Sequence, residues 1–177
     1  MKIIAFGASY SRSSINKQLA AYAARHFENA EVEVLDLNTY QLPLYTIDLE
    51  IEIGHPQAAK DFITKLDEAD ILIISMGEHN GSYETAFKNL FDWGTRVKMH
   101  LFENKKILLL STAPGARGGL SVLQAAQERF PRHGAEILAA FSLPNFGDNF
   151  SAEKGIINEE FRFEFFEAIE QAKAEFI

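Results

Sequence analysis

The stretch ILIIS, from Ile71 to Ser75, is a continuous apolar run, and ILLL, from Ile107 to Leu110, is a second one. The segment KIIAF, from Lys2 to Phe6, is a third. Apolar runs of this length are typical of strands that are covered on both faces, as strands are in parallel sheets. These three stretches therefore predict the centre of a buried parallel sheet.

Amphipathic stretches separate the apolar runs, and each places apolar side chains at helical spacing. Two weaker strands, Glu31–Leu35 and Glu136–Phe141, complete the alternation. The expected helices are Ser14–Phe27, His55–Glu68, Tyr83–Trp93, Leu120–Phe130 and Glu159–Phe176. Five strands that alternate with five helices indicate an α/β fold with a parallel sheet, in a single domain over residues 1–177. Residues 38–56 fit neither period, and a connection of this length is often functional.

The composition excludes several kinds of site. The chain has no cysteine, which rules out disulfides, thiolate zinc sites, cysteine-ligated iron–sulfur clusters and cysteine nucleophiles. No second histidine stands at metal-ligand spacing from any of the five, so we expect no metal site. The formal net charge of −8 argues against binding to nucleic acid or to an anionic membrane. No apolar run is long enough for a signal-peptide core or a membrane span, and we expect a cytoplasmic protein.

The loop after the first strand has a composition suited to a phosphate. In open parallel sheets, ligands bind beyond the carboxyl ends of the strands. There, residues 7–16 hold four serines, Arg12 and an asparagine at the start of a helix, which supplies backbone N–H groups, hydroxyls and a cation. The alternative is a loop in which Ser13 or Ser14 only caps the helix. Neither G-x-x-x-x-G-K-S/T nor G-x-G-x-x-G occurs there, which favours a mononucleotide cofactor.

Two further loops follow the third and fourth strands. Residues 76–83 contain Asn80-Gly81, a strong turn signal, and glycine lets the backbone approach a flat ligand closely. Residues 111–119 contain three glycines and two hydroxyl side chains ahead of the next helix. Either loop alone could be a tight turn with a helix cap, and His79 could be a solvated histidine rather than a general acid. Three such loops at one edge of a sheet indicate a ligand site.

All three loops resemble those of the NADPH-dependent FMN reductase family. The family pattern G-S-x-R/S-x-x-S-x-N corresponds to residues 8–16, with Ala8 in place of the first glycine. P-E-Y-N-G-S corresponds to residues 77–82, and S-x-S-P-G-x-x-G-G corresponds to residues 111–119 with Ala113 in place of a serine. Leu42-Pro43-Leu44-Tyr45 followed by Asp48 resembles the family element L-P-x-Y/F-x-x-D. The similarity extends from Lys2 to about Phe141.

This resemblance implies a flavodoxin-like, three-layer α/β/α sandwich with a five-stranded parallel sheet in the order 2-1-3-4-5. It also implies that FMN is the cofactor and that the first loop holds its phosphate, with Lys17 near Arg12 as charge support. The second loop would contact the isoalloxazine ring, largely through backbone groups, and the third would flank the other edge of the ring. The implied FMN-binding residues are Ser9, Ser11, Arg12, Ser14, Ile15, Asn16, Glu78, His79, Asn80, Gly81, Ser111, Pro114, Gly115 and Gly118.

The second loop departs from the family pattern, because Gly77 and His79 stand where the family has proline and tyrosine. The tyrosine ring would help to wall the flavin, so its replacement changes the expected substrate pocket. No group that hydride chemistry needs is lost, since the flavin itself is the redox centre. We therefore expect no catalytic side chain.

The implied activity is that of an NAD(P)H-dependent flavin oxidoreductase, with NADPH or NADH as co-substrate. It would pass a hydride through FMN to a small-molecule acceptor such as a flavin, a quinone or an azo compound. The alternative is a flavodoxin-type carrier that passes single electrons to protein partners, which the acidic charge would suit. Carriers usually place aromatic residues on both ring-side loops, and residues 77–82 and 111–119 contain none. Family members are commonly dimers or tetramers, so we expect a homodimer or homotetramer.

Overall fold

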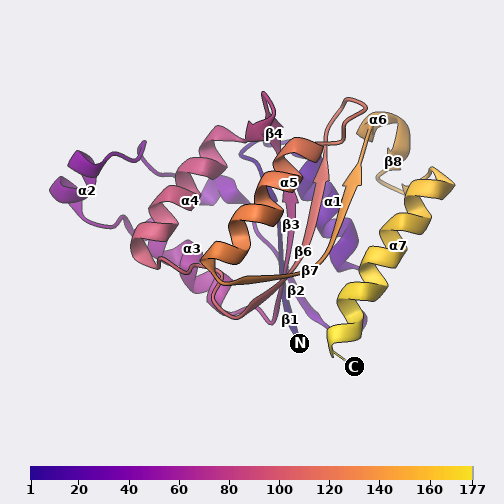
Figure 1. The fold of residues 1–177 in the computed structure, drawn as a ribbon, viewed down its shortest axis with the longest axis horizontal. Helices are drawn as coiled ribbons and strands as arrows, with labels where there is room; N and C mark the ends of the chain where they lie inside the picture. Colours follow the sequence, from indigo (N-terminus) through magenta and orange to yellow (C-terminus); the bar gives the residue numbers. More distant parts are fainter. Residues whose placement is uncertain (177) are drawn as a thin grey trace.

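A five-stranded parallel sheet forms the centre of the molecule in the computed structural model, which describes residues 1–176 (Figure 1). Its strands are β1 (Lys2–Ala8), β2 (Glu31–Val34), β3 (Ile71–Met76), β6 (Lys105–Thr112) and β7 (Ala135–Leu143). Their order is β2-β1-β3-β6-β7, and every neighbouring pair is parallel. Counted along the main sheet, this is the expected order 2-1-3-4-5, so the flavodoxin-like α/β prediction is confirmed.

Helices cover both faces of the sheet. On one face lie α1 (Ile15–Ala24) and α7 (Glu159–Lys173), which pack on the side chains that the strands direct to that side. On the other face lie α3 (Gln57–Asp67), α4 (Thr85–Val97) and α5 (Leu120–Arg129). Alternate residues of each strand face opposite sides, so β1 divides its side chains between two separate cores. This explains why the middle of each central strand carries apolar side chains on both faces.

Smaller elements fill the connections. Three 3-10 turns lie after β2, α5 and α7, and two short hairpins and a one-turn helix lie in the connections after β3 and β7. They are η1 (Leu37–Thr39), β4 (Glu78–His79), β5 (Ser82–Tyr83), η2 (Phe130–His133), α6 (Phe146–Asn149), β8 (Phe150–Ser151), β9 (Gly155–Ile156) and η3 (Ala174–Phe176). None of the helices between residues 1 and 176 is both long and apolar enough to cross a lipid bilayer.

The long connection after β2 forms an arm that projects from the body, and its tip is the short helix α2 (Ile47–Ile53) (Figure 1). Contacts from Asn89, Trp93 and Arg96 fix the arm to α4. The Trp93 indole N–H donates to the Pro43 carbonyl at 2.8 Å, and the Arg96 guanidinium contacts the Glu50 carboxylate at 2.9 Å. No residue of α2 is buried. The arm is therefore an ordered projection with its apolar side chains exposed.

Strand register brings the three predicted loops to one edge. Ala8, the last residue of β1, pairs with Met76 of β3, which in turn pairs with Ser111 of β6. The loops that follow these strands therefore start at the same level of the sheet. Parallel strands end on one side, so all three loops open toward a common crevice.

Candidate cofactor-binding site

The first loop turns directly from β1 into α1. A Cβ atom at Gly7 would overlap the backbone of Lys17, so glycine allows the helix to start this close to the strand. Ser14 caps the helix, because its Oγ accepts a hydrogen bond from the Lys17 N–H at 3.1 Å. The cap is satisfied by one serine, and within residues 1–176 the N–H groups of Ile15 and Asn16 have no hydrogen-bond partner. Two donors at a helix N-terminus are thus free to bind an anion.

The Asn16 side chain is committed to the scaffold. It is 5% exposed, and its Nδ2 donates to the Thr112 carbonyl at 3.1 Å. Its Oδ1 accepts from the Ser75 hydroxyl at 2.7 Å and from the Thr112 N–H at 3.1 Å. One buried amide therefore joins the start of α1 to the ends of β3 and β6. This leaves Asn16 its backbone N–H for a ligand.

The second loop is a β-hairpin between β4 and β5. Asn80 and Gly81 both have positive φ, 50° and 74°, which suits a tight two-residue turn and agrees with the turn that the sequence predicts. His79, Asn80 and Gly81 are exposed at its tip. The Glu78 carboxylate points away from the tip and accepts from the Val122 N–H at 3.0 Å, in the first turn of α5. Glu78 therefore anchors the hairpin through its side chain.

The glycine at position 77, where the family has proline, lies against the first loop. A Cβ atom there would stand 2.9 Å from the Ala8 carbonyl oxygen and 3.2 Å from the Ser9 Cβ. Gly77 is buried, and the two loops touch at this point. The replacement thus brings the first two loops closer together than a larger residue would allow.

Hydrogen bonds to the Gly118 carbonyl determine the shape of the third loop. The Ser111 and Ser142 hydroxyls both donate to the Gly118 carbonyl, at 2.8 and 3.0 Å. Gly118 has φ 58°, and a Cβ atom there would lie 2.9 Å from the backbone of Leu143. Ser111 and Gly118 are buried, whereas Pro114 and Gly115 are exposed. The two buried residues fix the path of the loop, and the exposed ones present its surface.

The three loops enclose a cavity of about 210 Å³, which we call the three-loop pocket. Its lining includes eight of the residues that the resemblance implies: Ser9, Ser11, Ser14, Ile15, Asn16, Glu78, His79 and Pro114. Arg12, Asn80, Gly81, Ser111, Gly115 and Gly118 do not line it. Sequence reasoning did not single out four lining residues that stand inside the same loops: Ser13, Gly77, Thr112 and Ala113. Cofactor sites usually enclose 300 Å³ or more, so this pocket has room for part of a mononucleotide, with the remainder over its rim.

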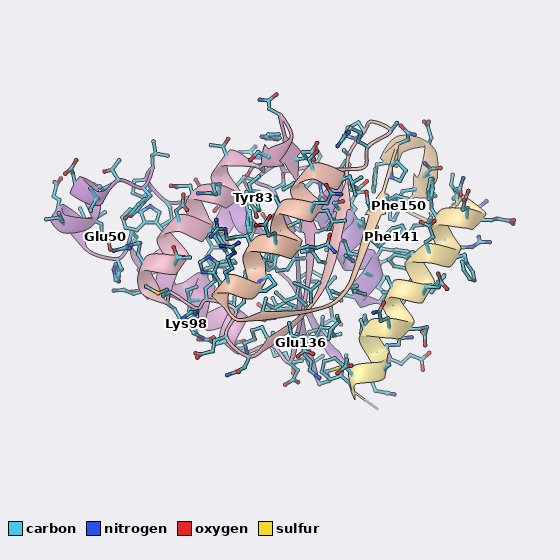
Figure 2. The ribbon with its side chains drawn as sticks, in the orientation of Figure 1. Glu50, Tyr83, Lys98, Glu136, Phe141 and Phe150 are labelled. Atoms are coloured by element: carbon cyan, nitrogen blue, oxygen red, sulfur yellow. The ribbon has the colours of Figure 1, made fainter. Side chains whose placement is uncertain are left out.

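The cations near the sheet edge can now be ranked. Arg12 lies within the first loop and is exposed, whereas Lys17 pairs with Asp36 at 2.9 Å. The Arg117 guanidinium donates to Ser121 in α5. Lys98 lies at the opposite end of α4 from the hairpin, where it pairs with Asp67 (Figure 2). Of these four cations, Arg12 alone belongs to the first loop, which also supplies the N–H and hydroxyl donors suited to a phosphate.

Sequence comparison assigns the family. Residues 1–148 match the model of the NADPH-dependent FMN reductase family. The chain belongs to this family. The match confirms the family expected from the loops, and with it the class of enzyme: an oxidoreductase that works with FMN and NAD(P)H.

Curated relatives of this FMN reductase family member include enzymes named for quinones. It is 32% identical over 120 residues to a 2-hydroxy-1,4-benzoquinone reductase of a Burkholderia species, an alignment that covers 67% of this chain and 63% of that one. It is 32% identical over 91 residues to an NADPH:quinone oxidoreductase of Arabidopsis thaliana, covering 51% of this chain and 45% of that one. The chain thus spans about half to two thirds of the length of these quinone reductases.

Solved structures share the fold. The flavoenzyme FerB of Paracoccus denitrificans, an NAD(P)H:acceptor oxidoreductase, superposes with a TM-score of 0.73 at 18% identity, over 98% of this chain and 97% of that one. An azoreductase of Bacillus anthracis superposes with a TM-score of 0.60 at 19% identity, over 98% and 99% of the two chains. At these identities the likeness establishes the flavodoxin-like fold.

Proposed function

We propose that this protein binds FMN in the three-loop pocket and transfers a hydride from NAD(P)H to a small-molecule acceptor of the quinone type. The observation that carries this proposal is the convergence of three strand ends on one pocket, with the free N–H groups of Ile15 and Asn16 in its wall. The FMN reductase family match and the quinone reductases among the relatives support the substrate class.

The residues of the pocket fit FMN by their chemistry. A phosphate would be bound by the two helix N–H groups and by the serine hydroxyls of the first loop. Arg12 stands in the same loop, outside the lining of the pocket. The backbone of the second loop and the Ala113–Pro114 edge of the third loop would lie along the flavin ring. FMN, when bound, supplies the redox chemistry, accepting a hydride and passing two electrons on. The protein contributes binding, orientation and a rigid wall.

Twelve of the fourteen implied residues divide by role under this proposal. Those that line the pocket would contact the cofactor directly. Ser111 and Gly118 would act by shaping the third loop, since their polar groups are occupied within it. Asn80 and Gly81 would act by forming the hairpin turn that holds His79 at the pocket edge.

Aromatic residues favour the enzyme over a flavodoxin-type carrier. Tyr83, the first aromatic residue after the hairpin turn in the sequence, packs against Phe87 with ring centroids 6.3 Å apart. Its hydroxyl is buried without a hydrogen-bond partner, and burial raises its pKa to about 12. Tyr83 thus faces the core below α4 and α5. The ring-side loops themselves offer no aromatic cover, which leaves a flavin face open to a second substrate.

A proline substitution at Ile15 tests the pocket, because it removes one N–H donor at the start of α1. Ile15 is the first residue of α1, a position where proline preserves the helix but lacks the N–H. Ser14, with φ −55° and ψ 116°, lies outside the α region that a following proline disfavours. We expect Ile15→Pro to weaken FMN binding at least about tenfold, because hydrogen bonds to charged groups contribute about 1.5–3 kcal/mol. Flavin fluorescence measures the dissociation constant. Ile15→Ala, which keeps the N–H, is the matched control and should bind FMN nearly as the wild type does.

Turnover distinguishes the enzyme from the carrier. The FMN-loaded protein should oxidise NADPH or NADH in the presence of a benzoquinone, followed by the loss of absorbance of the reduced nicotinamide. FMN binding without such turnover would favour the carrier. Failure to bind FMN, or equal binding by Ile15→Pro and Ile15→Ala, would contradict the pocket.

We also propose that the arm mediates a homodimer. Ile47 and Ile51 on α2 are 64% and 80% exposed, and acidic residues alternate with them. A groove of about 280 Å³ between α4 and α5 offers the complement, with Phe91 among the basic side chains of Arg129 and His133. A second copy of the chain would place its acidic, apolar α2 there. Light scattering should give twice the 19.9 kDa of the chain, and a monomer would contradict the proposal. A homotetramer and a cytoplasmic location stay predictions.

A further inference from the structure

A second cavity, of about 310 Å³, runs along the outer face of α1. We infer that this α1 basic cavity, lined by Arg12, Lys17, Tyr22, Arg25 and Phe150, binds the adenosine end of NADPH and recognises its 2′-phosphate. The inference rests on the proposed function, since NADPH is the hydride donor there. It assigns the cavity a ligand of stated chemistry, an aromatic base that carries phosphate groups.

The charge of the cavity is opposite to that of the protein. The chain has a formal net charge of −8, yet three cations lie along this one face. Lys17 pairs with Asp36, whereas among residues 1–176 neither Arg12 nor Arg25 lies within 4 Å of a carboxylate. Lys17 and Arg25 stand eight residues apart on one helix, so their side chains project from the same face. The cavity therefore offers an unpaired guanidinium group near each end of α1, and a guanidinium binds phosphate oxygens through parallel N–H bonds.

The aromatic wall of the cavity comes from a different part of the chain. Tyr22 on α1 contacts Phe150 of β8 edge to face, with ring centroids 5.5 Å apart. Tyr22 also stacks on Phe165 of α7, and Phe150 stacks on Phe146 at 4.7 Å. Figure 2 places Phe150 beside the end of α7 that is nearest to the carboxyl edge of the sheet. Phe165 and Phe146 thus already cover one face of each ring, and a purine base would pack against the side of the pair that lines the cavity.

A glycine holds this wall in place. A Cβ atom at Gly155 would overlap the Tyr22 ring, so the backbone of the β8–β9 hairpin packs directly on the tyrosine. Gly155 has φ 72°, which glycine adopts without strain. The two rings are therefore fixed before any ligand arrives, and a ligand that stacks on them orders few additional side chains.

The position of the α1 basic cavity suits NADPH, whose nicotinamide and adenosine groups bind at separate places. Ser13 and Ser14 line both the α1 basic cavity and the three-loop pocket, so the two cavities meet at the start of α1. NADPH must bring its nicotinamide to the flavin, and its adenosine end then extends away from the flavin. A cationic, aromatic cavity that adjoins the cofactor pocket suits that end. NADH lacks the 2′-phosphate and would leave the guanidinium groups without their partner.

The test uses the FMN-loaded protein and adenosine 2′,5′-bisphosphate as the probe. Arg25 is exposed, so Arg25→Gln should fold, and its melting temperature checks this. We expect Arg25→Gln to weaken probe binding about tenfold in calorimetry and to raise the KM for NADPH by a similar factor, because one charge-assisted contact is lost. The kcat and the KM for NADH should not change. Arg25→Lys keeps the charge and should restore most of the affinity, and Arg132→Gln on η2 is the control for lost surface charge.

The possible outcomes distinguish failure of this inference from failure of the proposed function. Equal probe affinity in the wild type and in Arg25→Gln would overturn the inference, as would no binding of the probe at all. Weaker probe binding with an unchanged KM for NADPH would overturn the assignment to the hydride donor and indicate a separate site for free nucleotides. If FMN binds and NADH is oxidised while the probe does not bind, the proposed function stands and this inference fails.

Discussion

Two cavities meet at the start of α1, and they offer anions different kinds of partner. The three-loop pocket presents backbone N–H groups and hydroxyls that a buried hydrogen-bond network holds in position. The α1 basic cavity presents guanidinium groups on long, exposed side chains. Dipoles fixed in a scaffold are little affected by salt, whereas exposed charges are screened by it. An acidic protein can therefore hold a phosphate firmly in one place and exchange another nearby.

A substitution at Asn16 tests most directly whether a hydrogen-bond network holds the three-loop pocket in position. Asn16→Leu would leave the Ser75 hydroxyl and both backbone groups of Thr112 without their partner in a buried place. We expect the free energy of unfolding to fall by about 3 kcal/mol, since each unsatisfied buried group costs about 1–3 kcal/mol. Urea denaturation measures it, and FMN binding should be lost in parallel. Ser75→Ala, which removes a single hydrogen bond, should cost about 1 kcal/mol. Equal stability of Asn16→Leu and the wild type would show that the network does not support the pocket.

Substitutions at Glu78 test the anchor of the hairpin beside the three-loop pocket, and we expect a smaller loss of stability than at Asn16. Glu78→Ala removes the acceptor for the Val122 N–H, and helix caps of this kind contribute about 1 kcal/mol. Glu78→Gln keeps an acceptor and loses only the charge near the start of α5, so its effect should be about 0.5 kcal/mol. Thermal unfolding compares the two variants. If both lose the same stability, the charge rather than the hydrogen bond anchors the hairpin.

The smallest effect is expected at the ion pair of the α1 basic cavity. Hydrogen bonds from Lys17 and Asn38 lower the pKa of Asp36 to about 2 from its ordinary 3.8. A lowered pKa in the folded state means that this stabilisation is complete above pH 3.8 and is lost as the pH falls toward 2. The pair is half exposed, so we expect Lys17→Met to cost less than about 1 kcal/mol at neutral pH.

Unfolding curves at several pH values and salt concentrations check this prediction. The difference between Lys17→Met and the wild type should shrink on acidification and in high salt. Asp36→Asn serves as the matched control, because it removes the titrating group. A difference that stays constant with pH would assign the effect to packing of the lysine side chain.

The sheet and its loops were predictable because short-range patterns determine them. The apolar runs at Ile71 and Ile107 gave the central strands, and Asn80-Gly81 gave the hairpin turn. Residues 47–53 show the limit of such patterns. Their isoleucines alternate as in a strand, but the Thr46 cap and Gly54, with φ 69°, enclose a helix there.

The roles of individual site residues depended on distant partners. Asn16 matched a phosphate motif, yet its amide bonds Ser75 and Thr112, which lie 59 and 96 residues away. Glu78 likewise bonds a helix 44 residues on. The α1 basic cavity joins Arg25 to Phe150, which no local spacing connects. Loop composition predicted the candidate site, and the tertiary structure separates the side chains that line its pocket from those that hold the loops.

The buried amide of Asn16 has a consequence for how the cofactor is exchanged. The strands, and not the ligand, order the start of α1, because Asn16 is bonded to β3 and β6 without any phosphate. Little conformational entropy remains to be lost when FMN arrives, and little is regained when it leaves. The empty protein should thus keep its native fold and bind FMN without a folding step.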